Sequence, residues 1–459
     1  MDKHVRPIVL LTAGAAFMEL LDGTAIVTAL PTLGHAFGAS AVALNLSITG
    51  YLLAAAMGLP VCGWAAERYG VRRMFTFGLA LFTFASCLCM ASHNIVSFVS
   101  ARVLQGIGGS AMVSIGRLAV LRVTPKNQII HAIGMIVWPS LVAPVVGPVI
   151  GGFLVTYASW RWIFAINLPL GLVAMLASLR LMPPEASPKK RRFDLYGLFL
   201  LAWTLILLVG GSNALGEGHL NALWAVAAGL FFAGYTVWHC RHHPTPLLEF
   251  GVLRHRSYAV GVMWGATFRV AISTAPFLLP LFFQIVLGFN AFRSGLLVLC
   301  LFAGNLLMKT ATTKMLSNFG FRRIVIGNGL IATLSLAICA TFSPDSAIWL
   351  MAILLFVGGM SRSMQFTTLT TLQFADVPEA EMAQANTLSN LAVQLCIGFG
   401  PAFASLCLDL GTLMGQRTTP NLSDFQLAFM LAAALALVGV IGGLRLAPDS
   451  GANVIGPRA

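Results

Sequence analysis

Glu19 and Asp22 are the residues whose type and position most directly suggest chemistry. Both lie within the first long apolar stretch, 8–30, which is about the length needed to cross a bilayer. Because they are three residues apart, a helix places their carboxylates on the same face. An ionised acid without a partner is costly inside a membrane. This pair therefore predicts a helix face that lines a hydrated cavity, where it could carry protons or ions, or that meets an opposite charge.

Arg102 is the candidate opposite charge for Asp22. It lies near the start of another apolar stretch, 97–117, and is followed by Gln105 and Gly106. We predict that Arg102 pairs with Asp22 and that the glycines from Gly106 onward let the two helices pack closely. The alternative is that Arg102 extends along its helix to the membrane surface.

Three polar residues in the second half of the chain predict the lining of a substrate cavity, and these are Arg269, Gln284 and Arg362. Arg269 lies about half way along the apolar stretch 258–283, from where a side chain reaches the membrane surface with difficulty. A positively charged lining attracts anions and disfavours cations. The alternative is that these arginines only bind helix carbonyl groups, and the sequence leaves both interpretations open.

The elements that position these residues are membrane helices. Of the 459 residues 58% are hydrophobic and 9% are charged, whereas soluble domains are about 25% charged. The eight cysteines show no spacing typical of disulfides or metal sites, so we expect packing roles and no bound metal. We predict an all-α integral membrane protein with fourteen crossing helices at 8–30, 42–64, 74–92, 97–117, 131–156, 161–181, 195–213, 219–239, 258–283, 294–312, 322–342, 347–367, 385–411 and 425–446.

The distribution of lysine and arginine predicts the orientation in the membrane. Of the 28 basic residues, twenty fall in one set of connecting segments, three fall in the other set, and five lie within or at the edges of the apolar stretches. Because basic residues collect on the cytoplasmic side, we expect both termini there. This asymmetry also accounts for the net charge of +13 without any nucleic acid partner.

A short repeat indicates that the chain contains two related halves. The segment Tyr69–Met74 follows the second apolar stretch and resembles Phe319–Ile324, which follows the tenth. This spacing predicts two six-helix halves around a central site, an arrangement common in secondary transporters. An extra helix pair would lie between them, after the basic, proline-rich linker Pro183–Arg192. The predicted domains are therefore 1–182, 183–257 and 258–459.

The loop between the second and third stretches has the features of a gate. Its glycines permit tight turns, and its acid can pair with an arginine or cap a neighbouring helix. The alternative is that its basic residues only set the orientation in the membrane. The candidate gating residues are Gly63, Glu67, Arg68, Gly70, Arg72 and Arg73.

The fifth apolar stretch is rich in proline and glycine. Prolines remove backbone hydrogen bonds and glycines permit close packing, so we expect a kinked helix that serves as a hinge or seal between the halves. The alternative is a purely structural kink. The residues concerned are Pro144, Gly147, Pro148, Gly151 and Gly152.

No sequence signature of an enzyme or nucleotide-binding protein accompanies these features. A Walker-type Gly-Lys-Ser/Thr sequence is absent, and the glycine clusters lie inside apolar stretches. We therefore expect no cofactor and no enzymatic activity, and an ion gradient as the energy source.

On these motifs, the chain resembles the major facilitator superfamily over nearly its whole length, and within it the fourteen-spanner drug:proton antiporters. Residues 21–31 match the first-helix motif of that family, with Thr28 where asparagine is usual. Residues 63–73 match its cytoplasmic gating motif, with Glu67 in place of aspartate. Arg102 with Gln105–Gly106 matches the fourth-helix motif implicated in proton transfer.

The fifth-helix glycines and prolines match the motif associated with antiporters. The resemblance implies a proton-coupled exporter that moves drugs or toxic amphipathic compounds across the bacterial inner membrane by alternating access. Asp22 and Arg102 would couple protons to transport, and Glu19 joins them as a candidate because it shares a helix face with Asp22, although the family motif does not include it. We expect a monomer whose partners are a small-molecule substrate, protons and the lipid bilayer.

Two other functions stay open at this point. The arginines of the second half favour a small organic anion or an anionic metal chelate as the exported substrate. A non-transporting membrane sensor is a remote alternative, because the loops are too short to hold a signalling domain.

Overall fold

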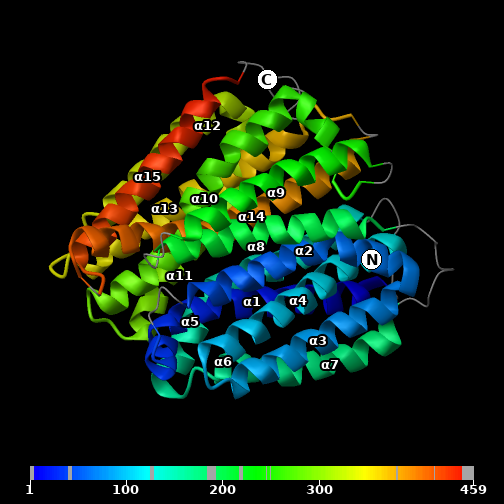
Figure 1. Ribbon diagram of the computed structural model, residues 1–459, viewed down its shortest axis with the longest axis horizontal. Coiled ribbons are helices and arrows are strands. Elements are labelled where there is room, and N and C mark those ends of the chain that lie inside the picture. Colours follow the sequence, from blue (N-terminus) through cyan, green and yellow to red (C-terminus); the bar gives the residue numbers. More distant parts are fainter. Residues whose placement is uncertain are drawn as a thin grey trace. The chain divides into compact units, whose positions relative to one another are not determined.

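The computed structural model describes residues 5–39, 44–124, 129–182, 193–216, 221–243, 246–248, 250–378, 381–417 and 419–446. Every regular element among these residues is a helix (Figure 1). Thirteen of the helices are long and apolar enough to cross a membrane, and a shorter apolar stretch, Leu195–Leu208, lies in a further helix. The predicted all-α membrane architecture is therefore confirmed, with thirteen to fourteen crossing helices in the part of the chain that is described.

The chain forms two compact units. The N-terminal unit comprises Met1–Leu198 with Asn290–Gly295, and the C-terminal unit comprises Phe199–Phe289 with Leu296–Ala459. The predicted division at 182 and 257 stays a prediction, and the predicted linker Pro183–Arg192 lies outside the described residues.

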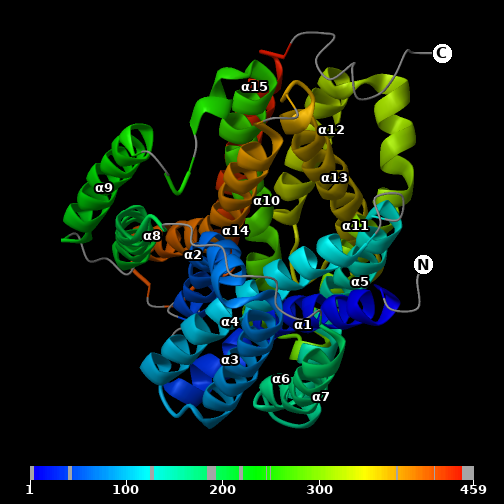
Figure 2. The ribbon, with the colours of Figure 1, turned by 90° about the vertical axis from the view of Figure 1, so that its right-hand side faces the viewer.

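The N-terminal unit is organised around its first helix. Helix α1 packs against α4, α5, α6 and α7, while α3 packs against α4 and α7, and α2 against α4 (Figure 2). Aromatic and aliphatic side chains with no exposed surface, such as Phe75 and Phe82, fill the space between α3 and its neighbours. The bounds are α1 Val5–Phe37, α2 Asn45–Tyr69, α3 Val71–Ala91, α4 Ile95–Val123, α5 Ile129–Tyr157, α6 Trp162–Ala165 and α7 Asn167–Leu181.

The C-terminal unit is organised around α10, which packs against α13, α14 and α15. By contrast, α9 turns large apolar side chains outward, among them Trp224, which is 81% exposed. Such a surface suits contact with lipid. The bounds are α8 Leu195–Gly216, α9 Ala222–His242, η2 Phe250–Arg254, α10 Arg256–Ile285, α11 Ala291–Phe319, α12 Phe321–Cys339, α13 Ile348–Phe374, α14 Met382–Met414 and α15 Leu422–Gly443.

The two copies of the short sequence repeat adopt the same backbone geometry. Gly70 separates α2 from α3 with φ of 90°, and Gly320 separates α11 from α12 with φ of 76°. In both turns the glycine carbonyl accepts a hydrogen bond from the amide four residues later, at 3.2 Å from Met74 and 3.3 Å from Ile324. Only glycine adopts such positive φ angles readily, which explains its place in both copies.

Candidate functional site

Asp22 lies buried in the middle of α1, with 2% of its surface exposed. Its carboxylate forms an ion pair with Arg102 of α4. It also accepts hydrogen bonds from Gln105 Nε2 at 3.0 Å and from Asn167 Nδ2 of α7 at 2.7 Å. Three helices therefore meet at one carboxylate, which is held by one cation and two amides.

Arg102 is equally buried, with 1% of its surface exposed. Besides Asp22, its Nη1 donates a hydrogen bond to Gln105 Oε1 at 2.5 Å. Its guanidinium carbon lies 4.4 Å from the centre of the Tyr51 ring and 5.8 Å from that of Phe164, where cation–π attraction operates. The structure thus places Arg102 beside Asp22, and its side chain does not extend to the surface as the alternative proposed.

A second layer of polar groups from α3 supports the amides that hold Asp22. Ser86 Oγ accepts hydrogen bonds from Gln105 Nε2 at 2.8 Å and from Asn167 Nδ2 at 3.3 Å, and Cys89 Sγ lies 3.7 Å from Gln105 Oε1. Sequence reasoning did not identify Ser86 or Asn167 as members of the site. The available signal was a buried amide and a hydroxyl within apolar stretches, because buried polar groups in proteins are nearly always partnered.

Glu19 lies one helical turn before Asp22 and keeps part of its surface exposed. It accepts a hydrogen bond from Tyr51 Oη of α2 at 3.1 Å. Among the described residues no lysine or arginine forms an ion pair with Glu19, since the neighbouring Arg102 is paired with Asp22. The predicted shared face of the two acids is therefore present, but their partners differ.

The fifth helix packs closely on α1 just beyond Asp22. A Cβ at Gly151 would overlap the backbone oxygen of Ala25 and would lie 2.8 Å from Thr28 Oγ1. Gly147 faces Thr24 in the same way, and Gly152 faces the backbone of Ala291. Three prolines, Pro139, Pro144 and Pro148, lie within one continuous helix, Ile129–Tyr157. The predicted close packing is present, and the hinge role stays a prediction.

The predicted gating loop is attached to the end of α7. Arg72 donates two hydrogen bonds to the Met182 carbonyl oxygen, from Nε at 2.9 Å and from Nη2 at 2.6 Å. The Arg68 guanidinium lies over the rings of Trp64 and Tyr69, at 5.4 and 5.8 Å from their centres. Of the other predicted residues, Gly63 lies at an exposed position, Gly70 forms the turn and Arg73 lies at the start of α3. The side chain of Glu67 lies outside the described residues.

In the C-terminal unit, Arg269 is buried in α10 with 1% of its surface exposed. Its Nη1 donates to the Gly261 carbonyl oxygen at 3.0 Å, its Nη2 donates to Thr370 Oγ1 at 3.3 Å, and its guanidinium carbon lies 5.5 Å from the centre of the Phe366 ring. No acid pairs with Arg269 within the described residues. The contact with Gly261 is of the kind that the carbonyl-binding alternative requires.

Arg362 lies on α13, one turn from the aromatic ring that underlies Arg269. Its guanidinium carbon lies 5.9 Å from the centre of the Phe302 ring, and its Nη1 has no hydrogen-bond partner among the described residues. Lys309 Nζ donates to Thr367 Oγ1 of the same helix at 2.7 Å. One segment of α13 therefore carries Arg362 and contacts both Arg269 and Lys309. Gln284 does not join them, because it is fifteen residues from Arg269 along α10, a rise of about 22 Å.

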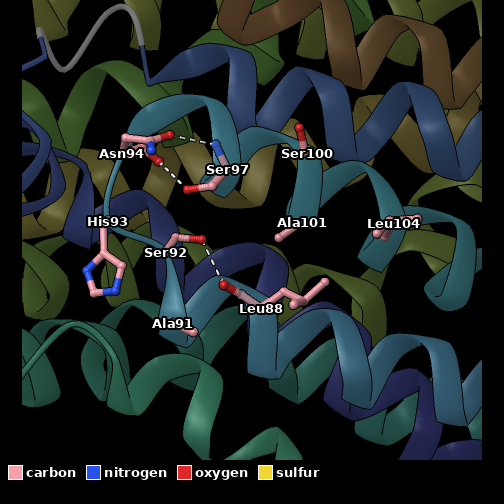
Figure 3. A pocket seen from close by; sticks show the side chains of 9 residues that line it. All are labelled: Leu88, Ala91, Ser92, His93, Asn94, Ser97, Ser100, Ala101 and Leu104. Carbon is pink, nitrogen blue, oxygen red and sulfur yellow. Dashed lines mark hydrogen bonds between the residues drawn. The ribbon is translucent and has the colours of Figure 1, made fainter.

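A cavity of about 430 Å³ opens at the turn between α3 and α4 (Figure 3). Asn94 caps α4 there, because its Oδ1 accepts a hydrogen bond from the Ser97 amide at 2.8 Å. Among the described residues that line it, His93 is the only ionisable one. Neither Asp22 nor Arg102 contributes to the lining, so this cavity is separate from the site around Asp22. It is lined by Leu88, Ala91, Ser92, His93, Asn94, Ser97, Ser100, Ala101 and Leu104.

Comparison with solved structures shows which fold the helices form. A D-xylose-proton symporter matches with a TM-score of 0.70 at 16% identity, covering 98% of this chain and 99% of that one. The POT family transporter PepTSo matches with a TM-score of 0.71 at 13% identity, covering 96% of this chain and 98% of that one. The helices therefore adopt the transporter fold that these proteins share.

Comparison of sequences extends the similarity to relatives of the same length. The chain is 35% identical over 449 residues to the "Putative multidrug resistance protein MdtD" of Yersinia pestis (strain Pestoides F), covering 95% of both chains. The protein of the same name from Yersinia pseudotuberculosis (strain IP 31758) matches equally. The motifs of the first, fourth and fifth helices also predict similarity to proteins of the MdtD type. A profile of the Major Facilitator Superfamily matches residues 12–401. The chain belongs to the major facilitator superfamily and is a multi-pass membrane transporter.

Proposed function

We propose that this transporter is a proton-coupled exporter of drugs or toxic amphipathic compounds, with Asp22 as its central protonation site. The buried Asp22–Arg102 ion pair is the observation that carries the proposal. Ionised Asp22 attracts Arg102 strongly where water is excluded, whereas protonated Asp22 does not. Proton binding would release Arg102 and bias the packing of α1 against α4. Coupling of this kind links protonation to conformation, as exchange by alternating access requires.

Two further observations support export across a bacterial inner membrane. The relatives that share 35% of the sequence are bacterial and carry multidrug resistance in their name. The close contact of Gly147 and Gly151 with α1 agrees with a helix that moves with, or seals against, the proton site. We infer that both termini are cytoplasmic, from the excess of basic residues in one set of loops.

Exchange measurements in proteoliposomes test this proposal. Vesicles loaded with ethidium, a cationic dye, are placed under an imposed pH gradient, and dye movement is followed by fluorescence. We expect dye to move against its own gradient, in the direction opposite to protons. Movement should reverse with the pH gradient and stop when an ionophore collapses it. Dye movement that is equally fast without a gradient would contradict proton coupling.

A second candidate substrate class is a small organic anion or an anionic metal chelate. The specific observation is that Arg269, Arg362 and Lys309 converge on one segment of α13, with no acid paired to them within the described residues. Unbalanced positive charge attracts anions. Fluorescein, an anionic dye, should then be transported in preference to ethidium. The variant Arg269→Ala should lose fluorescein transport, while Arg293→Ala, at an exposed position, serves as the control.

A further inference from the structure

The N-terminal unit contains two acids beside a single buried arginine. Asp22 takes the arginine, together with the amides of Gln105 and Asn167. Among the described residues, Glu19 has only the Tyr51 hydroxyl as a hydrogen-bond donor, at 3.1 Å. If both acids were ionised, the cluster of Glu19, Asp22 and Arg102 would carry a net charge of −1. Uncompensated charge is strongly disfavoured away from water, so one proton should remain in the cluster while the ion pair is intact.

Glu19 is the better of the two acids to hold that proton. Asp22 is stabilised as an anion by a cation and two amide donors, and hydrogen bonds to the charged form favour ionisation. Glu19 receives one donor, and a protonated carboxyl can still accept the same hydrogen bond through its carbonyl oxygen. Glu19 also keeps part of its surface exposed, whereas Asp22 is 2% exposed. Glu19 is therefore less tightly enclosed by protein than Asp22, while Tyr51 is the one side chain described as bonding to it.

The surroundings of Glu19 contain few other titratable groups. Asp22 lies on its own helix, Tyr51 on α2 and Arg102 on α4. On α5 the segment 138–156 has no ionisable residue, and α6 has none. Arg117 of α4 is adjacent to Gly116, whose neighbour on α1 is Thr12, two turns from Glu19. Among the described side chains, no second cation is positioned to compensate Glu19.

A small residue on α4 makes room for the contact between Glu19 and Tyr51. A Cβ at Gly109 would lie 3.0 Å from Tyr51 Oη and 3.2 Å from Glu19 Cγ. These contacts are tight, so a larger residue would displace the acid or the phenol. The glycine therefore contributes directly to the geometry of this pair.

We propose that Glu19 is a second protonation site, which holds a proton while Asp22 is paired with Arg102. This inference rests on the proposed proton coupling and deepens it. Glu19 takes a proton from water and becomes a neutral carboxylic acid, still hydrogen-bonded to Tyr51. Protonation of Asp22 is then a second event, which separates Asp22 from Arg102. The cluster can therefore exchange two protons with its surroundings, where Asp22 alone could exchange one.

Infrared difference spectroscopy of the purified transporter in lipid tests the proposal without any substrate. A protonated carboxylic acid has a carbonyl stretch that an ionised carboxylate lacks, so a change of pH reveals each buried acid that titrates. The wild type should show one such band from Glu19 and one from Asp22, beside any from other buried acids such as Asp424. Glu19→Gln should lose the Glu19 band and keep the Asp22 band. Asp22→Asn should remove the Asp22 band. Tyr51→Phe leaves both acids in place and should shift only the Glu19 band, because its hydrogen bond is gone.

A spectrum of Glu19→Gln that equals the wild-type spectrum at every pH would overturn the proposal. So would a Tyr51→Phe spectrum in which neither band moves. Thermal unfolding of each variant shows whether it is folded, and Tyr51→Phe provides the test if Glu19→Gln does not fold. The bands report protons on the acids whether or not transport occurs. Failure of the exchange experiment would therefore remove the proposed function without removing the Glu19 band.

Discussion

The stability of the buried ion pair can be tested by a double-mutant cycle at Asp22 and Arg102. Arg102→Met leaves a buried carboxylate that keeps the hydrogen bonds from Gln105 at 3.0 Å and Asn167 at 2.7 Å. Removing one partner of a buried ion pair costs about 3–5 kcal/mol. Because the two amides still solvate Asp22, we place the loss for Arg102→Met near the lower end, at about 3 kcal/mol.

The opposite change has a similar cost. Asp22→Asn leaves Arg102 with the carbonyl oxygen of Gln105 and the rings of Tyr51 and Phe164, so we expect a loss of about 3 kcal/mol as well. The double variant buries no charge. Its loss should therefore be well below the sum of the two, at most about 4 kcal/mol, which gives a coupling energy of at least about 2 kcal/mol.

Reversible unfolding in mixed detergent micelles at neutral pH provides the free energies for all four proteins. A parallel cycle with Arg254→Met and Glu381→Gln, an exposed pair on η2 and before α14, serves as control and should show much weaker coupling. Strictly additive losses at Asp22 and Arg102 would refute the reasoning, because they would mean that the two side chains do not interact energetically.

Three other changes have defined outcomes. Gly151→Ala drives a Cβ into the Ala25 backbone, and overpacking of this kind should destabilise the protein by about 1–3 kcal/mol, measured by thermal unfolding. Gly70→Ala forces a side chain onto a residue with φ of 90°, which should cost about 1–3 kcal/mol, whereas Gly63→Ala, at an open position, should cost less. The hydrogen bond from His255 and the charge of Arg254 lower the pKa of Glu381 below its ordinary 4.5. The stability that Glu381 contributes is therefore present above pH 4.5 and is lost as the pH falls through the lowered pKa. The melting temperature of the wild type should fall over this pH range, and that of Glu381→Gln should depend less on pH.

Hydropathy was sufficient to predict the helices, because a membrane admits only segments whose backbone polar groups are bonded internally. The first stretch was predicted as 8–30, whereas α1 extends from Val5 to Phe37. Its ends continue beyond the apolar part, where composition no longer distinguishes a helix from a loop. The repeated turns at Gly70 and Gly320 could be read from local sequence, since positive φ angles select glycine.

The partners within the site were harder to predict. Arg102 could be matched to Asp22 because charges inside a membrane need compensation. Ser86, Asn167 and Tyr51 could not, since serine, asparagine and tyrosine occur at many uncharged positions and their contacts join residues far apart in sequence. Gln284 was predicted to line the same cavity as Arg269; the structure places it about four turns farther along α10, and its role in a shared cavity stays a prediction. The charged members of the site could be identified from the sequence. Its neutral members depend on how α1, α3, α4 and α7 pack together, which the sequence does not show.

The central claim is that protonation of Asp22 drives exchange. Its most direct test is ethidium movement under an imposed pH gradient in proteoliposomes containing Asp22→Asn, which keeps the shape of the side chain but cannot take up the proton. Asp345→Asn, in the exposed loop between α12 and α13, serves as the matched control. We predict that Asp22→Asn abolishes gradient-driven exchange while Asp345→Asn retains the wild-type rate. Gradient-driven exchange that persists in folded Asp22→Asn would contradict the role assigned to this residue.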